Sequence, residues 1–173
     1  MNETLKTILE RRSIRNFKDT MIDEETMQQI LLAGTHTPTA RNLQTPIIIE
    51  ITDKEIRKEL AKENAKIGGW PEDFDPFYGA PVVLLVIAKN TPTAVYDGSA
   101  VIMNLLNAAW SLGVGSCWIH RAKEELESDF GKVLLKKLHI EGDYVGIGHI
   151  ALGYIDGKIP EMKPRKDNWI YKI

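Results

Sequence analysis

The stretch DGSAVIMNLLNAAWSLGVGSCWI, residues 97–119, carries more information about the fold than any other part of the chain. Its segment 99–112 is apolar on almost every side, which predicts a helix buried in the middle of a domain or at an interface. Gly113 and Gly115 end that helix, and segment 116–120 has the composition of a short strand. A buried helix that leads directly into a strand indicates a domain of mixed helix and sheet.

The spacing of apolar residues predicts the remaining elements. Helices are expected at 5–12, 23–34, 53–66 and 123–138, the last with a possible interruption near Gly131, and strands at 47–51, 82–88 and 143–154. Asp23 and Asp53 are suited to cap the helices that follow them. Every position of 82–88 is apolar, so this strand should be covered on both faces. Helices flanking a central sheet, in one domain over residues 1–173, is the simplest architecture.

Composition and charge exclude several classes of protein. The 173 residues carry a net charge of −2 and the pI is about 6.1, whereas nucleic-acid-binding proteins usually present a strongly basic face. The single cysteine, Cys117, excludes an internal disulfide, and its neighbours predict an inert packing thiol. The histidines lack metal-ligand spacing, so we expect no metal site. Because neither a signal peptide nor a membrane-spanning apolar run is visible, we expect a cytoplasmic protein.

Two basic clusters lie at opposite ends of this acidic chain. The first is Arg11-Arg12-Ser13-Ile14-Arg15, and the second is Lys163-Pro164-Arg165-Lys166. If the first is extended, alternation directs Arg11, Ser13 and Arg15 to one side. Together the clusters fit one compact anion such as a phosphate, because the guanidinium fork can bond two phosphate oxygens. The alternatives are a solvated helix end for the first cluster and an ordinary basic tail for the second.

Two further segments are suited to contact a ligand. Loop 38–44 holds hydroxyl, amide and guanidinium groups that can bond the polar edge of a heterocycle, although a turn closed by local hydrogen bonds also explains them. At the junction 113–119, glycines let backbone N–H groups approach a ligand closely. A plain tight turn explains these glycines as well.

Taken together and in this order, the segments make the chain resemble the FMN-dependent nitroreductase family. The resemblance covers nearly the whole length and rests on RRSIRNF (11–17), PTARNLQTP (38–46), FYGAPVVLLVIA (77–88), DGSAVIMNLLNAAWSLGVGSCWI (97–119) and KPRK (163–166). It implies an α+β fold with a central, mostly antiparallel sheet surrounded by helices. It also implies a homodimer that exchanges its C-terminal tails and holds two FMN sites at the interface.

The resemblance assigns the phosphate end of FMN to both basic clusters. Arg11 and Ser13, with Arg12 beside them, match residues that hold the phosphate and the ribityl end. Lys163 and Arg165 match tail residues that close on the phosphate.

The same resemblance assigns the flavin ring to three other places. Arg15 matches the basic residue near the N1/C2=O edge. The loop that usually reaches the flavin of the partner subunit corresponds to Pro38, Thr39 and Asn42. The segment whose backbone lines the ring near N5 and O4 corresponds to Trp118, Ile119 and His120.

This chain also departs from the family pattern. Thr39 stands where Ser is common, which preserves the hydroxyl group. His120-Arg121 stands where many relatives have a small residue, which could narrow the site or add a charge that binds a ligand. The chain also lacks the long insertion that many relatives fold over the substrate pocket, so the resemblance does not determine the substrate class.

The implied function is that of an NAD(P)H-dependent FMN oxidoreductase. Hydride passes from NADH or NADPH to flavin N5 and then to an electron-poor acceptor, a nitroaromatic or a quinone, in ping-pong order. Arg15 suits the stabilisation of negative charge at N1/C2=O, and no catalytic side chain is assigned. Two alternatives stay open: a flavoenzyme of the same family with other chemistry, such as dehalogenation or ring oxidation, and a non-catalytic FMN-binding module.

Overall fold

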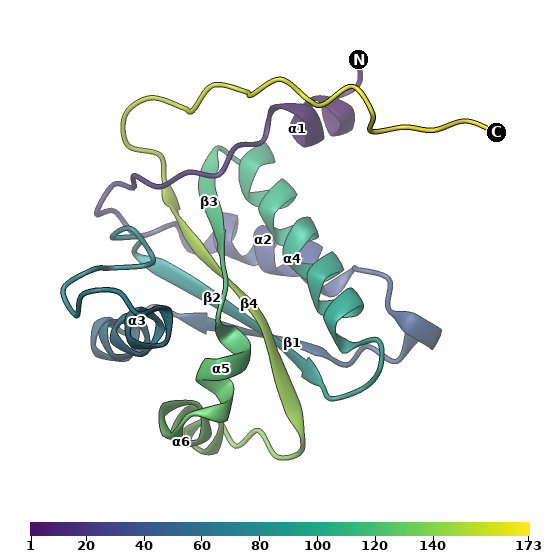
Figure 1. Cartoon of the computed structure of the whole chain (residues 1–173). Coiled ribbons are helices and arrows are strands. Elements are labelled where there is room, and N and C mark those ends of the chain that lie inside the picture. The colour runs from purple at the N-terminus through teal and green to yellow at the C-terminus, as the bar shows by residue number, and fades with distance from the viewer.

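The computed structural model, which describes residues 1–173, is built on a four-stranded antiparallel sheet with helices on both faces (Figure 1). The strands are β1 (Pro46–Ile51), β2 (Val82–Lys89), β3 (Val114–Ile119) and β4 (Tyr144–Tyr154). Their order is β1-β2-β4-β3, and every neighbouring pair is antiparallel. The α+β class and the antiparallel sheet are therefore confirmed, with β3 as an edge strand.

Helices fill the connections between the strands. They are α1 (Glu3–Glu10), α2 (Glu24–Thr35), α3 (Lys54–Gly68), α4 (Ala94–Ser111), α5 (Ala122–Glu127) and α6 (Asp129–Lys137), with a short 3₁₀ turn, η1 (Ala40–Asn42). The predicted caps are confirmed: the carboxylate of Asp23 accepts from Thr26 N–H and that of Asp53 from Ile56 N–H, each at 2.9 Å.

Most helix ends lie within two residues of the prediction, and two helices show where their boundaries come from. Helix α4 begins at Ala94 rather than at 99, because its polar first turn is held by the Asp97 carboxylate, which accepts from the Thr93 hydroxyl at 3.0 Å. The interruption predicted near Gly131 in helix 123–138 is confirmed and falls at Ser128, which is extended (φ −73°, ψ 169°) and caps α6. Gly131 lies directly against the backbone of Leu126, where a Cβ atom would overlap it. The break therefore falls before Gly131.

The side chains of β2 alternate between two hydrophobic cores. Val83, Leu85 and Ile87 face one core, to which α3, α5 and α6 contribute. Val82, Leu84 and Val86 face the other core, to which α2 and α4 contribute. The prediction that this strand is covered on both faces is confirmed.

Apolar side chains are left exposed on three elements of the single chain. Helix α1 buries no residue, and Leu5, Ile8 and Leu9 on it are about half exposed. The outer side of α4 exposes Val95, Tyr96 and Met103, and the tail exposes Trp169, Ile170 and Tyr171. Beyond β4, the tail crosses the end of the molecule where α1 lies (Figure 1). None of the helices is both long enough and apolar enough to cross a membrane.

Candidate functional site

The first basic cluster is extended along the outer edge of β3. The N–H of Ile14 donates to the carbonyl oxygen of Ser116 at 2.9 Å, and Ser13 forms a parallel bridge with Ser116. Ile14 is 2% exposed and is buried in the core against this strand. Its neighbours Ser13 and Arg15 therefore face the opposite way, as the alternation of an extended segment requires.

Three residues of the first basic cluster affect the pKa of one group, the thiol of Cys117: Arg11, Ser13 and Arg15 all lower it. Burial raises the pKa of this thiol above its ordinary value of 9.0, against the opposing effects of Arg15, a hydrogen bond with Ser13, and Arg11. Cys117 itself is 2% exposed and stays protonated near neutral pH, which fits a packing cysteine.

Arg165, in the C-terminal tail, lies close enough to Arg11 for its positive charge to lower the pKa of Arg11. Burial lowers the pKa of Arg11, and the positive charges of Arg12 and Arg165 lower it further. Arg11, Arg12, Arg15, Lys163 and Arg165 form no ion pair with a carboxylate of the chain. Cations from both ends of the chain therefore gather without neutralisation, an arrangement suited to an anion.

Arg12 differs from its neighbours in the direction of its guanidinium group. One guanidinium nitrogen donates to the carbonyl oxygens of Leu9 and Arg11, both at 2.9 Å. This group completes the C-terminal end of α1, so the helix-end interpretation fits Arg12. Lys163 lies in the exposed tail.

The outer edge of β3 presents backbone groups between two anchored carbonyls. The oxygen of Ser116 accepts from Ile14, and that of His120 accepts from Asn64 Nδ2 at 3.0 Å. Alternate residues of a strand direct their N–H and C=O groups to the same edge. The N–H and C=O of Trp118 therefore point to the outer edge of β3, between the carbonyl groups of Ser116 and His120. The His120 ring stacks on the Trp118 ring with centroids 6.1 Å apart. The side chain of Ile119 is buried, so only its backbone can reach a ligand.

Two aromatic residues that the sequence prediction missed come from the long connection between α3 and β2. The guanidinium carbon of Arg121 lies 4.2 Å from the centroid of the Trp70 ring, and that of Arg15 lies 5.8 Å from the Tyr78 ring. Cation–π contacts of this kind hold flexible side chains in place. The length of the connection and its aromatic content were the available signals.

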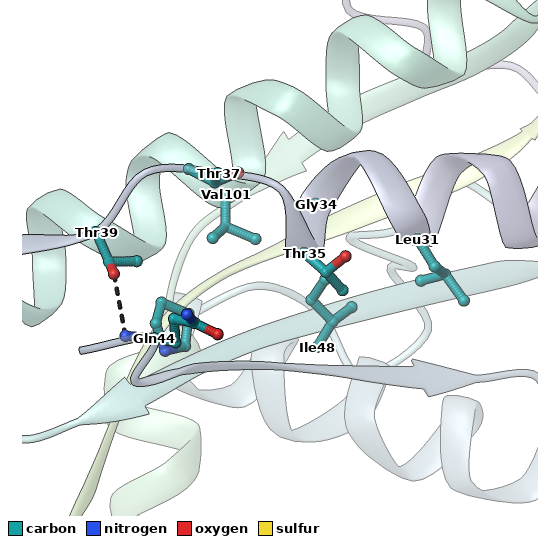
Figure 2. A pocket seen from close by; sticks show the side chains of 9 residues that line it. Leu31, Gly34, Thr35, Thr37, Thr39, Gln44, Ile48 and Val101 are labelled. Atoms are coloured by element: carbon teal, nitrogen blue, oxygen red, sulfur yellow. Dashed lines mark hydrogen bonds between the residues drawn. The ribbon is translucent and has the colours of Figure 1, made fainter. Parts of the chain in front are cut away.

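Loop 38–44 is closed by hydrogen bonds of its own. Thr39 Oγ1 accepts from the N–H of Gln44 at 3.0 Å (Figure 2), and Asn42 Oδ1 accepts from Gln44 Nε2 at 3.1 Å. Arg41, Asn42 and Gln44 have φ of 53°, 54° and 49°, a region that non-glycine residues rarely adopt. The local-turn interpretation accounts for these bonds. Pro38 is exposed beside them.

Polar residues of α4 hold this loop in place, and the sequence prediction missed them because it treated α4 as apolar on almost every side. The N–H of Ala40 donates to the Asp97 carboxylate at 2.9 Å. Asn104 Nδ2 donates to the hydroxyl of Thr37 at 2.9 Å. A strained turn tied to a rigid helix keeps its shape, which suits a ligand contact.

A hollow of about 350 Å³ adjoins the loop, between α2, β1 and α4 (Figure 2). Leu31, Ile48 and Val101 form its apolar part, and Thr39 and Gln44 form part of its polar rim. None of the basic residues of the two clusters lines it.

One chain does not bring the loop and the basic clusters together. The loop is bonded to Asp97 and Asn104, in the N-terminal and middle parts of α4, whereas the first basic cluster pairs with β3, beyond the C-terminal end of α4 (Figure 1). The 18 residues of α4 span about 27 Å at 1.5 Å per residue. The predicted site residues therefore form two separate groups in the single chain.

Comparisons with a family model, with curated relatives and with solved structures support the fold described above. A family model described as Nitroreductase family matches residues 8–154. A putative NADH dehydrogenase/NAD(P)H nitroreductase of Archaeoglobus fulgidus is 33% identical over 89% of this chain and 86% of its own length. An NADPH-flavin oxidoreductase of Vibrio harveyi is 29% identical over 95% of this chain and 70% of its own length. The crystal structure of a Bacteroides fragilis nitroreductase with bound FMN matches with a TM-score of 0.89 and 26% identity, covering 100% of both chains. The chain belongs to the nitroreductase family.

Proposed function

We propose that this protein is an FMN-dependent oxidoreductase that takes electrons from NADH or NADPH. The observation that carries the proposal is the approach of Arg165, from the tail, to Arg11 and Arg12, none of which pairs with a carboxylate. The A. fulgidus and V. harveyi relatives carry names of NAD(P)H-dependent enzymes, and the B. fragilis structure holds FMN, which supports the same cofactor and reductant here.

The residues present fit FMN at its phosphate end. Arg11 and Ser13 on the extended segment, with Arg12 beside them, hold the phosphate and the ribityl chain. Lys163 and Arg165 close on the phosphate from the tail. Charge-assisted hydrogen bonds of this kind contribute about 1.5–3 kcal/mol each, so the phosphate supplies much of the affinity.

The residues present also fit the flavin ring. FMN, when bound, supplies the hydride-transfer centre, which no side chain of this protein can replace. Arg15, whose guanidinium carbon lies 5.8 Å from the centroid of the Tyr78 ring, would stabilise negative charge at the N1/C2=O edge of the flavin. The backbone of Trp118, Ile119 and His120 lines the N5/O4 edge.

The complete site requires a second copy of the chain. Pro38, Thr39 and Asn42 reach the FMN of the partner subunit, because in one chain their loop lies far along α4 from the basic clusters. The exposed apolar side chains of α1, α4 and the tail are suited to the interface of a homodimer. If the tails are exchanged between the subunits, as the family resemblance implies, each tail brings its Lys163 and Arg165 to the partner's Arg11, the arrangement that Arg165 has here within one chain.

The proposed acceptor is a small, electron-poor aromatic compound, a nitroaromatic or a quinone, reduced in ping-pong order. Trp70 and Phe74, each 39% exposed, present aromatic surface beside Arg121, with ring centroids 4.9 Å apart. A planar aromatic molecule stacks favourably on such rings.

One anaerobic experiment tests this function. Purified protein should show flavin absorbance, lose it on addition of NADH or NADPH, and regain it when a nitroaromatic or a quinone is added. A bound flavin that neither nicotinamide bleaches supports a non-catalytic FMN-binding module. Bleaching without reoxidation by any of these acceptors supports a family member with other chemistry, such as dehalogenation or ring oxidation. A protein that takes up no FMN refutes the proposal.

A further inference from the structure

Three polar side chains are buried together in an otherwise apolar region, between the sheet and helices α3 and α5. Asn64 of α3, Glu125 of α5 and His149 of β4 are 0%, 2% and 0% exposed. The ring of Phe77 meets the imidazole edge to face, with centroids 5.3 Å apart. Because apolar residues of similar volume often stabilise a core at least as well as buried ionisable groups, this cluster calls for a reason other than stability.

The cluster forms a continuous path to the backbone that follows β3. His149 Nε2 lies 2.6 Å from Glu125 Oε2. The other oxygen of Glu125 accepts from Asn64 Nδ2, which also donates to the carbonyl oxygen of His120 at 3.0 Å. The amide group of Asn has two N–H donors, so both are used here.

The bond to His120 also fixes the orientation of the Arg121 N–H. The carbonyl of His120 and the N–H of Arg121 belong to one planar trans peptide group, in which they point in opposite directions. Since the carbonyl points inward to Asn64, the N–H points away from this cluster. It donates to no backbone carbonyl of the chain. Arg121 has φ 78°, a conformation that non-glycine residues keep only when their surroundings impose it.

We propose that Asn64, Glu125 and His149 are positioning residues that hold the His120–Arg121 peptide group so that its N–H faces the flavin ring. This inference rests on the proposed function, in which this segment lines the N5/O4 edge. Asn64 Oδ1 and His149 Nδ1 have no hydrogen-bond partner, and Glu125 Oε2 and His149 Nε2 lie close together without hydrogen-bond geometry, so the cluster is not a fully satisfied stabilising network. What the cluster does fix is one peptide group at the edge of the site.

The test combines Asn64→Leu with a control on the same helix. Leu has the same branched shape and the same number of side-chain heavy atoms as Asn but no N–H donor, so the variant releases the His120 carbonyl. We expect the FMN dissociation constant to rise about threefold to tenfold, the loss of one oriented hydrogen bond. We also expect the amide resonance of Arg121 to shift in the FMN-free protein. Leu60→Ala, at a fully buried position one turn earlier, should lower the melting temperature and leave both readouts at their wild-type values.

Two further variants separate positioning from folding. Asn64→Leu alone leaves the Glu125 carboxylate without its donor, so the double variant Asn64→Leu/Glu125→Leu removes that buried charge while the His120 carbonyl stays released. It should fold and reproduce both changes. Glu125→Gln keeps an acceptor for Asn64 and should behave as the wild type. If wild-type protein takes up FMN and the double variant matches it in affinity and in the Arg121 resonance, the positioning role is refuted. If wild-type protein takes up no FMN, the proposed function fails instead.

Discussion

Removal of the Arg11 guanidinium tests the phosphate site. Arg11 is partly buried, and burial together with the positive charges of Arg12 and Arg165 lowers its pKa. An anion relieves that repulsion, so Arg11→Ala removes a charge-assisted bond worth about 1.5–3 kcal/mol. This corresponds to a rise in the FMN dissociation constant of about tenfold to hundredfold.

Flavin fluorescence measured during titration of FMN-free protein provides the assay, with riboflavin as the matched ligand that lacks the phosphate. Arg11→Ala should weaken FMN binding and leave riboflavin binding nearly unchanged. Lys132→Ala removes an exposed cation of α6 and should affect neither ligand. Equal losses for FMN and riboflavin, or no loss for FMN, would refute a phosphate contact at Arg11.

Three further results are expected. Asn104→Ala should weaken FMN binding and lower stability by about 1 kcal/mol, because it removes the bond that holds the loop. Asn107→Ala, on the same helix, removes a buried amide oxygen that has no hydrogen-bond partner, so it should neither weaken FMN binding nor lower stability; an equal loss of stability in urea unfolding would contradict this. Because the pKa of Cys117 is raised, its thiol should react little with a thiol reagent at pH 8 until the protein unfolds. Stability should also fall as the pH rises past 9.0, because the thiol of the unfolded chain ionises at lower pH than that of the folded protein. A native thiol that reacts as fast as the unfolded one would contradict the first expectation. The hydrogen bond from Thr26 N–H lowers the pKa of the Asp23 carboxyl in the folded protein. The ionised cap therefore contributes fully to stability above the ordinary pKa of 3.8, and this contribution is lost as the pH falls through the lower pKa of the folded protein. Asp23→Asn should remove that dependence from unfolding curves measured between pH 2 and about 5, and an unchanged slope would speak against the cap.

Local patterns predicted the parts of the fold that depend on neighbouring residues. The caps Asp23 and Asp53 and the alternation along β2 were predictable because helix starts and strand faces are set within a few residues. The start of α4 was not, because Asp97 is satisfied in part by Ala40, which lies 57 residues away in the chain. The separation into α5 and α6 depends on the close packing of Gly131 against the backbone of Leu126.

The candidate site shows the same division. The two basic clusters could be named from composition, yet their meeting depends on how the tail passes α1, which no local pattern contains. Asn64 carried a signal that was overlooked: it follows Ile56 and Leu60 at intervals of four residues, so it lies on the apolar face of α3. A polar residue at such a position is buried, and a buried amide needs partners.

The central claim is that each FMN site joins the first basic cluster of one subunit to loop 38–44 of the other subunit. Arg11→Glu and Thr39→Ala/Asn42→Ala each damage one half of every site, so each variant alone should bind little FMN. When the two are unfolded and refolded together in equal amounts, about half of the dimers are mixed, and one of the two sites in each mixed dimer has only intact halves. The account predicts recovery of about a quarter of the wild-type FMN sites by equilibrium dialysis. No recovery, with mixed dimers shown to form, would contradict it.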